Sequence, residues 1–313
     1  MMNTRAEAYA PATIANLGVG FDILGLALDE PGDYVTALPS DEPGVRIASI
    51  TGDGGLLPLE ASKNTAGVAA LSLLKQLGVS TGVILHIRKN LPLSSGLGSS
   101  AASAVAAAVA VNALMGNPCS DNELLPACLD GEASVSGYHA DNVGPSLFGG
   151  LMLVAGIRAD QIHQLPVPNS LHLALITPDV AVPTALARSV LPSSVPLKTM
   201  VAQTASVARL LNAIYRNDLE DMAHAMESDQ VIEPARAHLM PLLTEMRQVA
   251  REHGALGLVI SGAGPTLCAI CDDPQTAEKV SLALKDRYTL AGISSEARST
   301  QISANGARIT ALN

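Results

Sequence analysis

"NLPLSSGLGSSAASAVAAAVAV", residues 90–111, joins a loop of proline, glycine and serine to a run of alanine and valine. Gly96 and Gly98 let backbone amides approach a bulky ligand because no Cβ stands in the way. Ser99 or Ser100 is expected to cap the helix that the alanines form. Unpaired N–H groups and the helix dipole both favour an anion at such a loop. The stretch therefore predicts a phosphate-binding loop followed by a helix that packs closely against its neighbours.

The composition indicates a globular protein that acts on a small molecule. At 313 residues, 48% of them apolar, the chain can bury a sizeable core, and its length favours two domains. A net charge of -10 with only 19 Lys and Arg gives no basic surface for nucleic acid, and two Phe without Trp leave few stacking surfaces. No opening segment has the pattern of a secretory signal, and the most apolar run, 101–115, is too short to span a membrane. We expect a cytoplasmic protein without nucleic-acid or membrane partners.

The four cysteines are expected to be free thiols in a reducing compartment. Cys268 and Cys271 form a CxxC pair, a spacing shared with redox and metal sites. However, "TLCAICDD" is typical of a buried strand, in which residues three apart point to opposite faces. No His or second CxxC lies nearby to complete four metal ligands. The pair is therefore interpreted as two core residues.

Short strands alternate with helices along the chain. Asn64 is predicted to cap a helix, and the acid-rich "SDNE" from Ser120 is predicted to open another. The polar segment 158–170 is the best candidate boundary, which places the domains at residues 1–165 and 166–313. Strands are expected at 34–38, 46–51, 83–88, 151–156, 171–177, 256–260 and 266–271, and helices within 184–252 and at 275–286.

The end of the chain is expected to form a β-hairpin. Its "QISANGARIT", residues 301–310, contains an Asn-Gly pair. Two-residue hairpin turns favour this pair because both central positions need positive φ.

Two common phosphate-loop classes fit the opening stretch poorly. A Walker A loop needs a Lys-Ser or Lys-Thr pair after the glycines, and none follows here. "GLGSSA", 96–101, fits the dinucleotide-binding pattern, but that pattern should follow directly from a strand and precede an acid at the end of a second strand. Residues 89–95 intervene instead, and Asp121 and Glu123 open a helix. An NAD-dependent oxidoreductase stays an alternative that the relative binding of ATP and NAD would decide.

"PLSSGLGSSAA", residues 92–102, resembles the phosphate loop of the GHMP kinases. "APATIANLGVGFDILGLAL" (10–28) and "SGAGPTLCAI" (261–270) are similar to the first and third motifs of that family. "SGYHADNVGPSLFGG" (136–150) resembles a segment of its homoserine kinase branch. The resemblance implies an α+β fold, with an N-terminal ribosomal-protein-S5-like domain and a C-terminal ferredoxin-like domain. It also implies phosphoryl transfer from ATP.

The resemblance implies a set of contacts for ATP and Mg²⁺. Ser99 and Glu132 would hold Mg²⁺, which prefers oxygen ligands. Asn64 matches a nucleotide-side asparagine of the family, with a plain helix cap as the alternative. Lys89 would help to bind the phosphates, with a surface lysine as the alternative. The two glycines of the third motif would support the phosphate loop by close backbone approach. The expected ATP-binding residues are Asn64, Lys89, Pro92, Leu93, Ser94, Ser95, Gly96, Leu97, Gly98, Ser99, Ser100, Ala101 and Ala102.

L-Homoserine, the substrate that the resemblance implies, is a zwitterion. Its site needs an anion or carbonyls for the ammonium and a cation, preferably Arg, for the carboxylate. One acid, two arginines and several amides suit an amino acid better than a sugar. A mevalonate site, which has no ammonium to bind, would leave Asp22 without a partner. The expected substrate-binding residues are Asn16, Asp22, His139, Asn142, Arg188 and Arg236.

The resemblance implies catalysis by orientation and charge stabilisation, without an aspartate base. Asn142 is expected to orient the hydroxyl, Thr184 to contact the γ-phosphate and Glu132 to act through the metal. Asp141 would brace the loop.

Two further alternatives stay open at this point. One is another GHMP small-molecule kinase, of the mevalonate or sugar type. The other is a sensor on the same fold that binds without transferring phosphate, against which the intact Ser99 and Glu132 argue. A homodimer is an expectation from the family alone.

Overall fold

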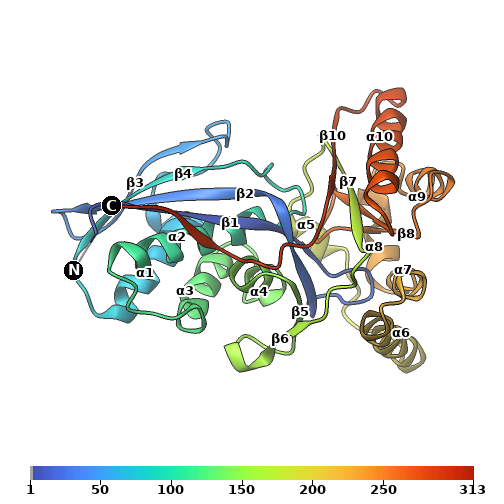
Figure 1. The fold of residues 1–313 in the computed structure, drawn as a ribbon, viewed down its shortest axis with the longest axis horizontal. Helices are drawn as coiled ribbons and strands as arrows, with labels where there is room; N and C mark the ends of the chain where they lie inside the picture. The colour runs from blue at the N-terminus through green and yellow to red at the C-terminus, as the bar shows by residue number, and fades with distance from the viewer. Residues whose placement is uncertain (1–2) are drawn as a thin grey trace.

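Two β-sheets organise the computed structural model, which describes residues 3–313 (Figure 1). The larger sheet has seven strands in the order β11-β1-β2-β4-β3, with β5 paired to β2 and β6 paired to β5. Neighbouring strands are antiparallel, apart from the parallel pair β3 and β4. The strands are β1 (Ala6–Ala15), β2 (Leu24–Ser40), β3 (Gly44–Thr51), β4 (Gly82–Arg88), β5 (Leu151–Val154), β6 (Ile162–Leu165) and β11 (Arg308–Leu312).

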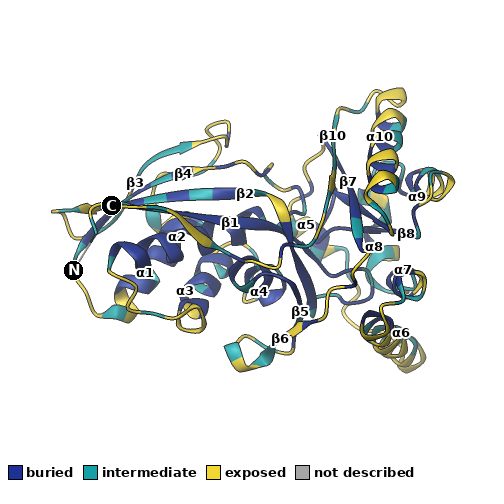
Figure 2. Cartoon of the chain, viewed as in Figure 1, coloured by how far each residue is buried: buried dark blue, intermediate teal, exposed yellow. Residues whose placement is uncertain are grey.

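Four helices cover one face of this sheet (Figure 1). Helix α2 lies at their centre and is buried from Ala101 to Leu114, as Figure 2 shows. Its alanines allow close packing: a Cβ at Gly131 would lie 2.8 Å from the Cβ of Ala104 and 3.0 Å from that of Ala69. A helix with neighbours on every side has no need of an amphipathic pattern. The four helices are α1 (Thr65–Leu77), α2 (Ser99–Leu114), α3 (Asp121–Ala133) and α4 (Ala140–Phe148).

The smaller sheet is antiparallel, in the order β10-β7-β9-β8. One face packs with α6 and α7 in a core continuous with that of the larger sheet, and the other packs with α9 and α10. Its strands are β7 (His172–Pro178), β8 (Gly257–Ile260), β9 (Leu267–Cys271) and β10 (Ser295–Thr300). The helices are α5 (Thr184–Ser189), α6 (Leu197–Arg216), α7 (Leu219–Met226), α8 (Ile232–Arg236), α9 (Leu243–Glu252) and α10 (Pro274–Leu290).

Local sequence signals predicted several elements correctly. Asn64 caps α1 by accepting a hydrogen bond from the Ala66 N–H at 3.1 Å, and Ser120 with Glu123 forms a capping box on α3. Cys268 and Cys271 point to the two opposite faces of β9, one into each core, as free thiols. The strands and helices expected along the chain are present, but the strand expected at 34–38 is part of the much longer β2, and the helix expected at 275–286 extends to Leu290.

The predicted C-terminal hairpin is wrong. Strand β10 pairs with β7, whereas β11 pairs with β1 of the other sheet, so the chain crosses between the sheets. The Asn305–Gly306 pair serves close backbone approach instead of a two-residue turn. A Cβ at Gly306 would lie 2.1 Å from the carbonyl oxygen of Leu147. The glycine therefore lets this crossing segment lie against the end of α4.

The chain passes from the larger sheet to the smaller one between β6, which ends at Leu165, and β7, which begins at His172. Strand β11 then returns to the larger sheet. The domain bounds of 1–165 and 166–313 stay a proposal. Strand β11 lies within the second range but belongs to the larger sheet, which the first range otherwise forms.

No helix among residues 3–313 combines the length and apolar character needed to cross a bilayer.

The packing around α2 predicts that its small side chains are required. We expect Ala106→Leu to lower the free energy of unfolding by about 1–3 kcal/mol, because the fully buried Ala106 has no room for added carbon atoms. Urea unfolding of the wild-type and variant proteins measures the change. Ala208→Leu, on the exposed side of α6, is the matched control. Equal effects of the two substitutions would contradict the tight packing of α2.

Candidate active site

The phosphate loop, residues 92–98, connects the end of β4 to the start of α2. Gly96 and Gly98 have φ angles of 82° and 63°, and Gly98 is the N-cap of α2. The predicted serine cap is wrong, because Ser99 is the first helical residue and its buried hydroxyl has no hydrogen-bond partner. A Cβ at Gly98 would lie 2.0 Å from Oγ1 of Thr13. Glycine is therefore required here by both backbone conformation and space.

The third motif supports the phosphate loop, as predicted. The Ser261 hydroxyl donates to the Gly96 carbonyl at 2.7 Å, and the Thr266 N–H donates to the Ser95 carbonyl at 3.1 Å. A Cβ at Gly262 would lie 3.1 Å from the Gly96 oxygen. The backbone of the smaller sheet's turn thus rests directly on the loop.

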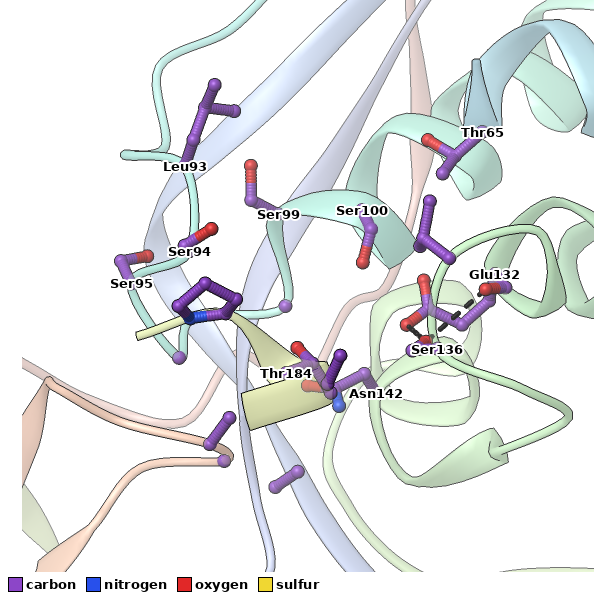
Figure 3. A pocket seen from close by; sticks show the side chains of 18 of the residues that line it. Thr65, Leu93, Ser94, Ser95, Ser99, Ser100, Glu132, Ser136, Asn142 and Thr184 are labelled. Atoms are coloured by element: carbon purple, nitrogen blue, oxygen red, sulfur yellow. Dashed lines mark hydrogen bonds between the residues drawn. The ribbon is translucent and has the colours of Figure 1, made fainter. Parts of the chain in front are cut away.

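A cavity of about 630 Å³ opens beside this loop. Its wall contains side chains from both halves of the chain, so the folded structure brings most of the predicted site together. Figure 3 shows Ser94, Ser95 and Ser99 on the loop, with Thr184 and Asn142 nearby. The predicted residues that line the cavity are Asn16, Asp22, Asn64, Lys89, Leu93, Ser94, Ser95, Gly96, Gly98, Ser99, Ser100, Glu132, His139, Asn142, Thr184, Arg188 and Arg236.

Four of the predicted ATP-binding residues lie outside the cavity wall. Pro92 is exposed, and its carbonyl accepts a hydrogen bond from the Ser95 hydroxyl at 2.8 Å. Leu97, Ala101 and Ala102 place their side chains in the core. These residues shape the loop through their backbone and packing.

Ser99 and Glu132 present unpaired oxygens at the start of α2. The hydroxyl oxygen of Ser99 and Oε2 of Glu132 are both buried without a hydrogen-bond partner. The other carboxylate oxygen of Glu132 contacts the Ser136 hydroxyl (Figure 3). Burial raises the pKa of Glu132 above its usual value, because the charged form is costly away from water. Both unpaired atoms are oxygens, the kind of ligand that Mg²⁺ prefers.

Lys89 and Asn64 have structural partners of their own. The Lys89 ammonium forms a buried ion pair with Asp33, while Asn64 caps α1 and also donates to the Pro58 carbonyl at 3.1 Å. Direct contact of either side chain with ATP stays a prediction.

Asp22 and Arg188 form a bidentate ion pair in the wall of the same cavity. The Arg188 guanidinium donates to Oδ2 and Oδ1 of Asp22 at 3.1 and 2.8 Å. Nδ1 of His139 lies 3.6 Å from Oδ2 of Asp22, and burial lowers the pKa of His139. Asn16 holds this corner by accepting from the Asp22 N–H at 3.1 Å and donating to the Gly262 carbonyl at 2.8 Å.

Arg236 adds a buried guanidinium beside the half-buried Arg188. It is only 3% exposed, and it donates to the carbonyls of Ala187 and Gly262, both at 3.0 Å. Burial and the neighbouring Arg188 lower the pKa of Arg236 to about 10. Both guanidinium carbons lie over the ring of Phe21, at 5.4 Å for Arg188 and 5.1 Å for Arg236. This corner therefore offers concentrated positive charge to an anionic group.

Asn142 is held in one orientation between the two ends of the cavity. The buried Thr13 hydroxyl donates to its Oδ1 at 2.7 Å, which leaves the amide N–H groups for a ligand. Thr184, the first residue of α5, lines the same cavity as Asn142 (Figure 3).

Asp141, next to Asn142, is a second buried acid in the cavity wall. It is 3% exposed, and its Oδ1 has no hydrogen-bond partner. Burial, with the nearby charges of Asp22 and Glu132, raises the pKa of Asp141 to about 7. This carboxyl lines the cavity but was expected only to brace the loop.

Sequence reasoning missed other residues of the cavity wall. Phe21 is one of two Phe in the chain and lies within the first motif, a position that could have singled it out. Ser136 opens the 136–150 segment but was given no role, and the 56–58 loop carries no sequence signal of its own. Only the folded structure places these residues in the cavity wall.

Comparisons with known proteins agree with this geometry. The model of the GHMP kinases N terminal domain matches residues 64–150, and that of the GHMP kinases C terminal domain matches residues 210–290. A homoserine kinase of Xylella fastidiosa (strain M12) is 42% identical over 306 residues, 97% of this chain and 94% of that protein. A homoserine kinase of Chlorobaculum tepidum is 39% identical over 314 residues, 96% of this chain and 97% of that protein.

A solved structure matches the whole fold. The crystal structure of homoserine kinase from Cytophaga hutchinsonii superposes with a TM-score of 0.94 at 40% identity, covering 99% of this chain and 98% of that one. The expected α+β fold class is thereby confirmed.

The buried Asp141 predicts a distinctive pH dependence of stability. Its pKa is about 7 in the folded protein against an ordinary value of 3.8, so the native state binds more protons between these pH values. The free energy of unfolding should therefore fall as pH rises from about 4 to 7, by up to about 4 kcal/mol at 1.36 kcal/mol per pKa unit. Asp141→Asn should remove this component, since an amide does not titrate.

Urea unfolding at pH 5 and pH 7.5 tests this expectation. The variant should gain stability over the wild-type protein at the higher pH. Asp179→Asn, at an exposed position, is the control. Parallel pH profiles for the wild-type protein and Asp141→Asn would show that Asp141 keeps an ordinary pKa.

Proposed function

The chain belongs to the GHMP kinases and is an ATP-dependent homoserine kinase of threonine biosynthesis, and from this premise we propose which residues perform each part of the reaction. The observation that carries the proposal is the pair of orphan oxygens on Ser99 and Glu132, buried beside the phosphate loop. The oxidoreductase, mevalonate-type or sugar kinase, and sensor alternatives are set aside with this premise.

The phosphate loop binds the phosphates of ATP mainly through its backbone. Residues 93–96 and 98 line the cavity at the N-terminus of α2, where free N–H groups and the helix dipole favour anions. No Lys-Ser or Lys-Thr pair follows the glycines, so the loop works without a Walker lysine.

Ser99 and Glu132 are the proposed Mg²⁺ ligands. A hydroxyl and a carboxylate offer the hard oxygens that this ion prefers, and both have an unused oxygen. When bound, Mg²⁺ neutralises charge on the phosphates as the phosphoryl group moves.

The Asp22–Arg188 pair and Arg236 are proposed to bind the two charges of L-homoserine. The ammonium of the substrate goes to Asp22 and its carboxylate to the two arginines, so the zwitterion replaces an internal ion pair with contacts of the same kind. When Asp22 and Arg188 separate, the ammonium and carboxylate of the substrate replace the charged partner that each side chain has lost. His139 and Asn16 hold Asp22 in place.

Asn142 orients the hydroxyl of homoserine towards the γ-phosphate, and Thr184 contacts that phosphate. Because the Thr13 hydroxyl donates to Oδ1 of Asn142, the amide presents its N–H donors to the substrate. An N–H that donates to the substrate hydroxyl occupies one lone pair of that oxygen and leaves the other free to attack the γ-phosphate. An amide cannot remove a proton, so positioning and charge stabilisation supply most of the catalysis. Homodimerisation, and the lack of nucleic-acid and membrane partners, stay predictions.

The metal role of Glu132 predicts a loss of turnover without a loss of folding. We expect Glu132→Gln to reduce kcat at least 100-fold, because the neutral amide is a much weaker ligand for Mg²⁺. Stability should hold or rise, since a buried charge is removed. ADP release with Mg-ATP and L-homoserine measures turnover, and thermal unfolding measures stability.

Glu278→Gln, on the exposed face of α10, is the matched control. Turnover of Glu132→Gln close to that of Glu278→Gln would remove Glu132 from the site.

The carboxylate role of Arg236 predicts a selective defect in homoserine binding. We expect Arg236→Leu to raise the KM for L-homoserine 10-fold or more with the KM for ATP little changed. Arg236→Lys keeps the charge but loses the two parallel N–H donors of the guanidinium. Its KM for L-homoserine should lie between those of the wild-type protein and Arg236→Leu. Steady-state kinetics on both substrates measures the effect.

A substrate without the carboxylate, 3-aminopropan-1-ol, provides the control. The wild-type protein should use it poorly, and Arg236→Leu should lose little further activity on it. A defect confined to ATP, or an equal loss on both alcohols, would refute the proposed contact.

A further inference from the structure

Asp33 and Lys89 form a buried ion pair beneath the phosphate loop. Their side chains are 0% and 2% exposed, and the pair joins β2 to the residue that follows β4. Neither the resemblance nor the proposed mechanism gives Asp33 a role.

The two partners hold opposite ends of the phosphate loop. Before the loop, Oδ1 of Asp33 accepts hydrogen bonds from the backbone N–H groups of Asn90 and Leu91, at 2.9 and 3.2 Å. After the loop, the Lys89 ammonium donates to the carbonyl of Ser99 at 2.8 Å and to the hydroxyl of Ser103 at 2.6 Å. The same ion pair therefore fixes both the entry to the loop and its exit.

The hydrogen-bond capacity of Lys89 is fully used in this position. An ammonium has three N–H donors, and Asp33, Ser99 and Ser103 supply three acceptors. The Ser103 hydroxyl in turn donates to Oδ2 of Asp33 at 3.0 Å. Lys89 has no donor left for a phosphate oxygen, and its charge is balanced by Asp33.

Stability alone does not explain such a pair. Taking two charges out of water costs free energy that their attraction only partly returns, and apolar replacements of buried pairs are often neutral or stabilising. What the pair supplies here is geometry: Ser99, whose carbonyl it holds, also carries the unpaired hydroxyl that faces the proposed metal site.

We propose that Asp33 and Lys89 form a clamp that closes the base of the phosphate loop and places Ser99 for binding of Mg-nucleotide. Both are positioning residues, which act through the backbone of residues 90–99 without touching ATP. The proposal rests on the proposed role of Ser99 as a metal ligand.

The test separates the clamp from the stability of the fold. The double variant Asp33→Asn/Lys89→Met carries no buried charge and nearly preserves volume. The amide oxygen introduced at position 33 can still accept from residues 90 and 91, but the thioether introduced at position 89 cannot hold the Ser99 carbonyl. Lys89→Met alone, which leaves Asp33 buried and unpaired, should be less stable than the double variant. Asp221→Asn, which breaks the distant ion pair between Asp221 of α7 and Arg209 of α6, is the control.

Three measurements on the full chain decide the outcome: thermal unfolding, hydrogen exchange of the hydrogen-bonded amides that flank the loop, at Asn90, Leu91 and Ala102 (called the loop amides below), and calorimetric titration with ADP with and without Mg²⁺. We expect the double variant to unfold near the wild-type temperature, to exchange the loop amides at least 10-fold faster, and to bind Mg-ADP at least 10-fold more weakly. The gain in ADP affinity on adding Mg²⁺ should shrink. Its KM for L-homoserine should stay within about threefold of the wild-type value.

Wild-type loop exchange or wild-type Mg-ADP affinity in the double variant would overturn the clamp, as would equal losses for ATP and homoserine. Failure of the wild-type protein to bind Mg-ADP would instead overturn the proposed function, and the exchange measurement would still decide whether the ion pair clamps the loop.

Discussion

Close approach of backbone to backbone around one loop is the constraint on which the rest of the structure depends. The loop at 92–98 meets β1 on one side and the turn after β8 on another, and at Gly98 a single added carbon would lie 2.0 Å from Thr13. Behind it, α2 is buried throughout and can lie deep in the core only because its side chains are small. The dense interior fixes the N-terminus of this helix rigidly. A rigid helix end is what an anion site needs, since its dipoles then require no rearrangement when a ligand arrives.

Local features of the fold could be predicted from the sequence, and long-range pairings could not. Asn64 and Ser120 mark helix starts because a cap depends on neighbouring residues. The alanine-rich β1, with Pro11 in its middle, carries no clear strand pattern and was not predicted. The Asn-Gly pair near the C-terminus predicted a hairpin because no local signal reveals that β11 pairs with a strand about 300 residues earlier. Strand partners so distant in the sequence are set by the whole fold.

The site shows the same division. Four motifs in order identified about half of the cavity wall, because each motif carries several groups that the chemistry requires. The motifs could not show how these groups pair with one another. Lys89 follows a strand and precedes a glycine loop, which favours a phosphate contact, yet its partner Asp33 lies 56 residues away in sequence. Asp22 and Arg188, both expected to contact the substrate, are hydrogen-bonded to each other in the structure.

The path of the last strand has a consequence for synthesis on the ribosome. Strand β1 leaves the ribosome about 300 residues before β11, the strand that completes one of its edges. The turn that supports Gly96 likewise lies beyond residue 260. A nascent chain therefore carries an unpaired sheet edge until β11 has been made, and an unsupported nucleotide loop until the turn after β8 has been made. Fragments released early would expose that edge, which is the form of β-structure most prone to pairing with other chains.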